Sequence, residues 1–138
     1  IVARMAAAEA QTASNTALTL AIAASYGGRQ DLTDAARALA VEVAAGRLRP
    51  EDIDEASLDA RVALADLPPP DLFIRTGGDH RISNFLLWQL AYTELWFTET
   101  LWPDLDAGVL QAALDDFAQR ERRFGLTGEQ VATQGAPA

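Results

Sequence analysis

Residues 71–98 read DLFIRTGGDHRISNFLLWQLAYTELWFT and contain two short apolar runs separated by a glycine pair and a longer mixed segment. Asp71–Arg75 is rich in aromatic and branched side chains, which predicts a strand ending at the glycine pair. Glu94–Phe97 predicts a second short strand on the same grounds. Between the two, Ser83 can cap a helix that reaches about Tyr92. This stretch therefore predicts a strand–helix–strand unit.

Outside this stretch the apolar pattern predicts one more strand and four more helices. The strand is the apolar run that contains Leu18, Leu20 and Ile22, and a glycine turn ends it. The helices are expected over Ile1–Gln11, over Asp31–Ala45 with Gly46 as its cap, over about Glu55–Ala65, and from Pro103, Asp104 or Asp106 to Arg123, with Gly125 as the stop.

The alternation of strands and helices is typical of an α/β fold, in which a parallel sheet carries helices on both faces. Three strands make a thin sheet. The first is apolar on both sides, so we expect it to be central, with further strands beside it. Because the sequence also opens within an expected helix and not on Met, we expect the fold of these residues to be incomplete. Residues 125–138 have little to bury and should form a flexible tail.

The amino-acid composition argues against several classes of partner and of active site. The net charge of −9 argues against a nucleic-acid partner, because phosphate backbones require a basic face. All eleven cations are Arg, and a single His with no Cys argues against a Ser-His-Asp triad, a thiol enzyme or a cysteine zinc site. No apolar run approaches the roughly 20 residues of a transmembrane helix and the first residues do not form a basic leader, so we expect a cytoplasmic protein.

Arginine and glycine gather where two of the expected strands end. Residues 26–29 read YGGR and residues 75–83 read RTGGDHRIS. Glycine N–H groups, a helix N-terminus after Ser83 and bidentate arginines suit a phosphate group, and a nearby carboxylate could hold Mg²⁺ against it. Equally, these arginines could be structural, and spacing alone does not separate the two readings. The candidate ion-pair partners are Asp31, Asp71, Asp79 and Glu94.

The same residues resemble a known family. Residues 71–98, with LWPD at 101–104, resemble the two C-terminal signature regions of the cis-prenyltransferases almost residue for residue. Residues 23–29 resemble the preceding signature, with Ser25 where the family usually has Asn. Residues 120–125, RERRFG, are similar to the bacterial undecaprenyl diphosphate synthase type. The resemblance covers the chain up to that point without gaps, and it implies that residues 1–124 are the C-terminal part of a single domain.

The resemblance implies a prenyltransferase that condenses isopentenyl diphosphate onto an allylic diphosphate, farnesyl diphosphate at the start. New cis double bonds would give a long polyprenyl diphosphate such as undecaprenyl diphosphate, a carrier lipid of cell-wall synthesis. The family also implies Mg²⁺ as cofactor and a homodimer. It implies no transmembrane segment, and it allows a peripheral membrane contact for product release.

Carried over position by position, the resemblance implies that Arg75, Arg81 and Ser83 grip the diphosphate of isopentenyl diphosphate. Glu94 is similar to the family's C-terminal Mg²⁺ ligand. His80 stands where some members have His, and it is either a metal contact or a solvent-facing spacer.

The family's N-terminal signature, His-x-Met-Asp-Gly-Asn-x-Arg-Trp, does not occur in this sequence. That signature supplies the essential Asp, so we expect no catalytic residue of this kind here and no activity from these residues alone. Two readings follow: part of an active synthase, or a non-catalytic fragment or subunit that dimerises and binds diphosphate. Product chain length does not follow from the sequence.

Overall fold

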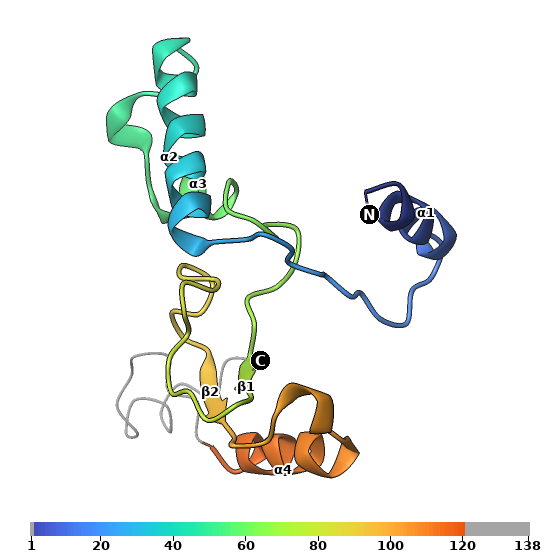
Figure 1. The fold of residues 1–138 in the computed structure, drawn as a ribbon. Coiled ribbons are helices and arrows are strands. Elements are labelled where there is room, and N and C mark those ends of the chain that lie inside the picture. The colour runs from blue at the N-terminus through green and yellow to red at the C-terminus, as the bar shows by residue number, and fades with distance from the viewer. Residues whose placement is uncertain (1, 121–138) are drawn as a thin grey trace.

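The computed structural model describes residues 2–120, which form an α/β fold with a parallel sheet (Figure 1). Figure 1 shows α1 standing apart on an extended segment, α2 with α3 beside it, and α4 next to the two strands. The elements are α1 (Val2–Thr12), α2 (Gly28–Ala44), the 3-10 turn η1 (Pro50–Asp52), α3 (Glu55–Asp59), β1 (Leu72–Arg75), β2 (Glu94–Phe97), the 3-10 turn η2 (Trp102–Asp104) and α4 (Ala107–Ala118).

The two strands predicted within residues 71–98 are confirmed, and they pair in parallel. Leu72 lies beside Glu94 and Arg75 lies beside Phe97. The N–H of Thr98, which follows β2, donates to the Arg75 carbonyl at 2.9 Å and so continues the pairing. In a parallel pair the carboxyl ends meet at one edge, so the loop after Arg75 lies beside the chain that leaves β2.

Helix α2 confirms a predicted helix and its predicted cap. It begins at Gly28, three residues before the expected start, and Gly46 follows its end with φ +69°. The Gly46 N–H donates to the Val43 carbonyl at 3.0 Å, and the Arg47 N–H donates to the Glu42 carbonyl at 3.0 Å. This is the Schellman arrangement, in which a glycine in the left-handed region satisfies the last carbonyls of a helix.

The prediction of a helix over residues 83–92 is wrong. The segment forms successive turns, with positive φ at Ser83 (48°), Asn84 (63°) and Leu86 (43°). The Asn84 carbonyl accepts from the Gly28 N–H at 2.7 Å. The Asn84 side-chain Oδ1 accepts from the Arg29 N–H at 2.9 Å. These bonds satisfy N–H groups at the start of α2 that have no partner inside that helix. The left-handed residues turn Asn84 toward α2, and a regular helix cannot contain them.

The prediction of a buried central strand through Leu18, Leu20 and Ile22 is also wrong for the described residues. The segment has no regular secondary structure, and these side chains are 82%, 77% and 73% exposed. A strand needs a neighbour for its N–H and C=O groups. Within residues 2–120 the sheet holds β1 and β2 alone, and neither pairs with this segment.

The remaining helices agree with the sequence in position more than in length. α1 matches the helix expected near the beginning of the sequence, and α3 ends at Asp59, earlier than predicted. Asp106, one of the three expected starts, caps α4 by accepting from the Val109 N–H at 2.9 Å. The prediction that this helix continues to Arg123 is wrong, because α4 ends at Ala118 and neither Gln119 nor Arg120 is helical. The predicted stop at Gly125 and the tail over 125–138 lie outside the described residues.

A polar contact network fastens the segments around α2. Asp31 accepts from the Tyr26 hydroxyl at 2.8 Å, the Ala63 N–H at 2.8 Å and Gln89 Nε2 at 3.2 Å. Gln89 Nε2 also donates to the Ala63 carbonyl at 2.8 Å. Three segments therefore converge on one carboxylate of α2, next to a small apolar core. The buried apolar residues of the described part are Ala35, Leu39, Val62, Leu86, Leu90 and Ala113.

We expect this network to weaken at high pH. Burial first, and then the hydrogen bond to Asp31, raise the pKa of Tyr26 from its ordinary 10.0 to about 12. A folded-state pKa above the unfolded value stabilises the fold fully below pH about 10, and that contribution is lost as the pH rises toward about 12. Urea unfolding across this range should show the loss in the wild type. In Tyr26→Phe the free energy of unfolding should be lower near neutral pH by about 1 kcal/mol and should lack this extra decline. Parallel pH profiles for the two proteins would contradict the assignment.

Candidate anion-binding site

The structure brings Arg75, Arg81 and Ser83 together at the carboxyl edge of the sheet. Arg75 is the last residue of β1, and its Nη1 donates to Ser83 Oγ at 2.7 Å and to the Arg81 carbonyl at 2.7 Å. These bonds hold the loop that follows β1 against the end of the strand. A hydroxyl and two guanidinium groups thus share one small region, as the spacing in the sequence suggested.

Asp79 joins the two arginines. Its Oδ2 accepts from Arg75 Nη2 at 2.7 Å and from Arg81 Nη2 at 2.6 Å. The Arg75 side chain is 22% exposed and fixed by several bonds, whereas the Arg81 side chain is 66% exposed. The interpretation that these arginines form ion pairs is therefore confirmed for Asp79. The ion pairs do not prevent anion binding, because one guanidinium carries five N–H donors and can serve more than one acceptor.

The glycine N–H groups of this loop are already used within the protein. Gly77 (φ +86°) donates to the Thr100 carbonyl at 2.8 Å, and Gly78 (φ +77°) donates to the Thr98 carbonyl at 3.0 Å. No helix begins at Ser83, so the expected helix N-terminus is not formed there. The expectation that glycine N–H groups and a helix N-terminus bind the anion is not supported. Anion contact at this edge falls on the arginine and hydroxyl side chains.

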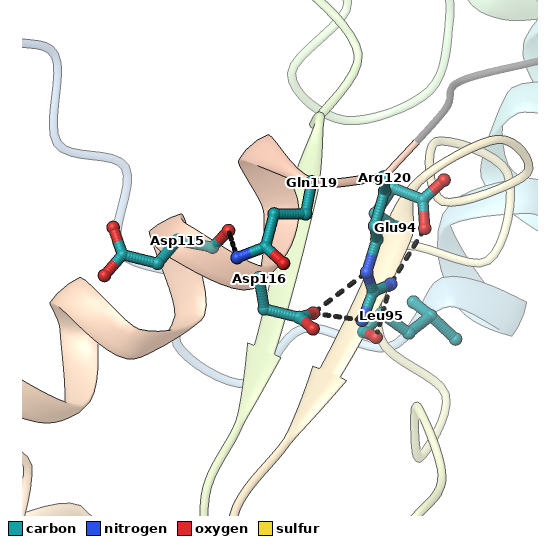
Figure 2. A network of polar contacts seen from close by, with 6 residues as sticks. All are labelled: Glu94, Leu95, Asp115, Asp116, Gln119 and Arg120. Atoms are coloured by element: carbon teal, nitrogen blue, oxygen red, sulfur yellow. Dashed lines mark hydrogen bonds and ion pairs between the residues drawn. The ribbon is translucent and has the colours of Figure 1, made fainter.

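Glu94 lies at the other edge of the sheet. It is the first residue of β2, three residues or about 10 Å along the strand from Phe97. Figure 2 shows its carboxylate held by Arg120, which follows α4: Arg120 Nη1 donates to Glu94 Oε2 at 2.8 Å and to the Leu95 carbonyl at 3.1 Å. On the other side of the guanidinium, Arg120 Nε donates to Asp116 Oδ2 at 2.9 Å. These bonds raise the pKa of Arg120 above its ordinary value, the one to Glu94 contributing most.

The two expected metal ligands do not converge. His80 stacks on Phe97 at the carboxyl edge, with ring centroids 4.9 Å apart and planes 16° apart, whereas Glu94 starts β2 at the opposite edge. Among residues 2–120 no group of three or more His, Asp or Glu side chains is placed to hold a metal ion. Mg²⁺ binding normally takes several oxygen ligands in octahedral geometry. The described residues therefore do not fit a Mg²⁺ site by themselves.

An apolar cavity of about 390 Å³ lies beneath the turns of residues 85 and 86. The continuous segment from Ala21 to Tyr26, which includes Ile22, forms part of its lining. Ala63 and Leu64 also line the cavity, and no local pattern indicated them. Long-range contacts hold this segment in place: the Ala63 N–H donates to Asp31 at 2.8 Å and its carbonyl accepts from Gln89 Nε2 at 2.8 Å. The cavity is of the size that holds small apolar ligands.

Comparison with known proteins gives the family. The family model described as "Putative undecaprenyl diphosphate synthase" matches residues 1–125. The chain belongs to this prenyltransferase family. A ditrans,polycis-undecaprenyl-diphosphate synthase ((2E,6E)-farnesyl-diphosphate specific) of Xanthomonas campestris is 78% identical over 135 residues, 98% of this chain and 52% of the relative. The chain thus spans about half the length of such curated relatives.

Two solved prenyltransferase-family structures share the fold. Lavandulyl diphosphate synthase from Lavandula x intermedia, in complex with dimethylallyl diphosphate, superposes with a TM-score of 0.85 at 41% identity, over 90% of this chain and 53% of that one. A protein described as a probable undecaprenyl diphosphate synthase from Campylobacter jejuni gives a TM-score of 0.72 at 35% identity, over 89% of this chain and 55% of that one. The α/β fold expected from the sequence is confirmed.

The part of this prenyltransferase-family chain that the structure describes has no helix long and apolar enough to cross a membrane.

We expect Arg120 to stabilise the docking of α4 on β2. Its side chain is 31% exposed and links Glu94 and Leu95 of β2 to Asp116 of α4, so Arg120→Ala should lower the free energy of unfolding by about 1–2 kcal/mol. Arg37 is the matched control, because its ion pair with Asp34 is exposed and lies within α2. Arg37→Ala should cost less than about 0.5 kcal/mol. Equal losses in urea unfolding would show that Arg120 does no more than a surface ion pair.

Proposed function

We propose that this chain is part of a cis-prenyltransferase that condenses isopentenyl diphosphate onto an allylic diphosphate, with farnesyl diphosphate as the first acceptor of new units. The product would be a long polyprenyl diphosphate such as undecaprenyl diphosphate. What carries the proposal is the joining of Arg75, Arg81 and Ser83 at the carboxyl edge of a parallel sheet, the edge where open α/β sheets bind ligands. Support comes from the names of the relatives and from the allylic diphosphate in the lavender neighbour.

In this proposal the side chains of the carboxyl edge bind and orient the diphosphate of isopentenyl diphosphate. Arg75, held by the loop, offers a fixed guanidinium, Arg81 can move toward the ligand, and the Ser83 hydroxyl adds a donor. The C–O bond of the allylic diphosphate breaks, the double bond of isopentenyl diphosphate forms the new C–C bond, and a proton leaves to give the new double bond. These residues contribute positioning and charge neutralisation, which supply most of the catalysis in reactions of this kind.

The cofactor and the assembly are also proposals. We propose Mg²⁺ as the cofactor, with Glu94 as one ligand and further ligands from outside the described residues. His80, the second candidate, lies at the opposite edge of the sheet, so it is not proposed to share an ion with Glu94 in this arrangement. Glu94 Oε1 makes no hydrogen bond to another side chain within residues 2–120. The family resemblance is the basis for proposing a homodimer, a peripheral membrane contact and a single domain over 1–124. The sequence pattern is the basis for proposing a cytoplasmic location and a tail over 125–138.

A non-catalytic role is the second candidate. One observation favours it: within residues 2–120 the expected metal ligands do not converge. A fragment or subunit with the arginine cluster would bind diphosphate and dimerise without transferring prenyl groups.

Prenyl transfer separates the two candidates. The assay follows labelled isopentenyl diphosphate into long-chain product, with farnesyl diphosphate and Mg²⁺ present. It is run on this chain and on a chimera in which the unmatched part of the Xanthomonas campestris relative is joined to it. We expect product from the chimera and none from the 138 residues alone. A folded chimera without product would favour the non-catalytic module.

In the active chimera, Arg75→Ala should raise KM for isopentenyl diphosphate about tenfold or more and lower kcat, because a charge-assisted contact of about 1.5–3 kcal/mol is lost. Arg75 also holds the loop, so Arg81→Ala is the cleaner companion: its side chain is exposed and bonds to Asp79. Arg37→Ala, in an exposed pair within α2, is the matched control. Wild-type kinetics in both site variants would remove these residues from the substrate site.

Glu94→Gln should raise the Mg²⁺ concentration for half-maximal activity about tenfold, since a neutral amide is a weaker ligand for a hard cation than a carboxylate. The variant also weakens the pair with Arg120, so Arg120→Ala serves as the control that removes the pair and keeps the carboxylate. A Mg²⁺ shift confined to Glu94→Gln supports the metal role. Equal shifts, or an unchanged Mg²⁺ titration, would make Glu94 structural.

A further inference from the structure

A single carboxylate oxygen occupies the space between the two arginines of the anion-binding site. Asp79 Oδ2 accepts from Arg75 Nη2 at 2.7 Å and from Arg81 Nη2 at 2.6 Å. These are distances of strong charge-assisted bonds. An oxygen that receives two guanidinium groups at once is placed as an oxygen of a bound phosphate would be.

A second carboxylate lies beside the loop that carries Asp79. The Glu99 side chain packs directly against Gly78, the residue before Asp79. Asp79 itself offsets part of the positive charge of the two arginines in the absence of ligand. A diphosphate that approaches must compete for N–H donors with a carboxylate already in place, and it must come close to that negative charge.

We propose that Asp79 is a built-in competitor for diphosphate that limits the affinity of the Arg75–Arg81–Ser83 site. In the free protein it holds both guanidinium groups close together, and it gives up its bonds when the ligand binds. Asp79 is suited to this exchange because its side chain is 39% exposed and the Arg81 side chain is 66% exposed, so both can turn toward solvent. Arg75 keeps its bonds to the Arg81 carbonyl and Ser83, which do not depend on Asp79.

The proposal rests on the proposed function and adds a consequence for it. A site built only of arginine and hydroxyl groups would bind any diphosphate tightly, including the diphosphate that the reaction releases. A competing carboxylate weakens every anion that binds these donors by the same factor, so only ligands that gain further contacts elsewhere still bind tightly. Repeated condensation would then be favoured, because the site empties between additions.

The test measures the affinity of inorganic diphosphate for the full 138-residue chain by titration calorimetry. Asp79→Asn keeps the size of the side chain and removes its charge, so we expect binding about 3- to 10-fold tighter than in the wild type. Asp115→Asn is the matched control: it makes the same change of net charge on α4, where Asp115 bonds to Gln111. Its affinity should equal the wild-type value. Weaker or unchanged binding in Asp79→Asn, or equal tightening in both variants, overturns the proposal.

A kinetic measurement keeps the test independent of how the 138 residues behave alone. In the chimera, Asp79→Asn should lower KM for isopentenyl diphosphate and should not raise kcat, whereas loss of a merely structural residue would raise KM or lower activity. If the chimera transfers prenyl groups but Asp79→Asn does not lower KM, the competitor role fails and the proposed function stands. If neither wild type nor Asp79→Asn binds diphosphate and the chimera is inactive, both fail.

Discussion

Parallel pairing of β1 with β2 places Arg75 beside Phe97 at one edge of the sheet and Glu94 beside Leu72 at the other. The rest of the site depends on this register. It brings the loop after Arg75 against the chain leaving β2, where carbonyls of Thr98 and Thr100 take the glycine N–H groups of that loop. With those groups used, the loop presents side chains at its surface. A shift of one residue would turn every strand side chain to the opposite face and separate the cluster.

Arginine pairing explains how a candidate anion site can exist in an acidic chain. The chain carries a net charge of −9. Asp79 contacts both Arg75 and Arg81 at the carboxyl edge, and Glu94 and Asp116 contact Arg120. The planar guanidinium serves several acceptors at once, which an ammonium group cannot do with the same geometry. Each such arginine therefore stabilises the fold and still has N–H groups that can donate to a further acceptor. The same property left the functional and structural readings equally open when only spacing was known.

The sequence predicted local features well and long-range contacts poorly. Both strands within residues 71–98, the cap at Gly46 and the start of α4 at Asp106 depend on neighbouring residues and are confirmed. The pairing of Glu94 with Arg120, 26 residues apart, depends on how α4 lies against β2, which no local pattern encodes. Residues 83–92 show the conflict most clearly. They have a helical pattern, and tertiary bonds from Asn84 to the start of α2 outweigh that preference.

Residue types and order alone were enough to establish an α/β chain of the prenyltransferase family whose arginines and hydroxyl gather after a strand. Three-dimensional packing decided which of these groups meet: Arg75 with Ser83 and Asp79, and Glu94 with a different arginine at the far edge. It also left Leu18, Leu20 and Ile22 without a partner strand in the described residues. The physical reason is common to these cases. Turns and caps are satisfied within a few residues, whereas strand neighbours and ion-pair partners are satisfied only by segments that the whole fold brings near.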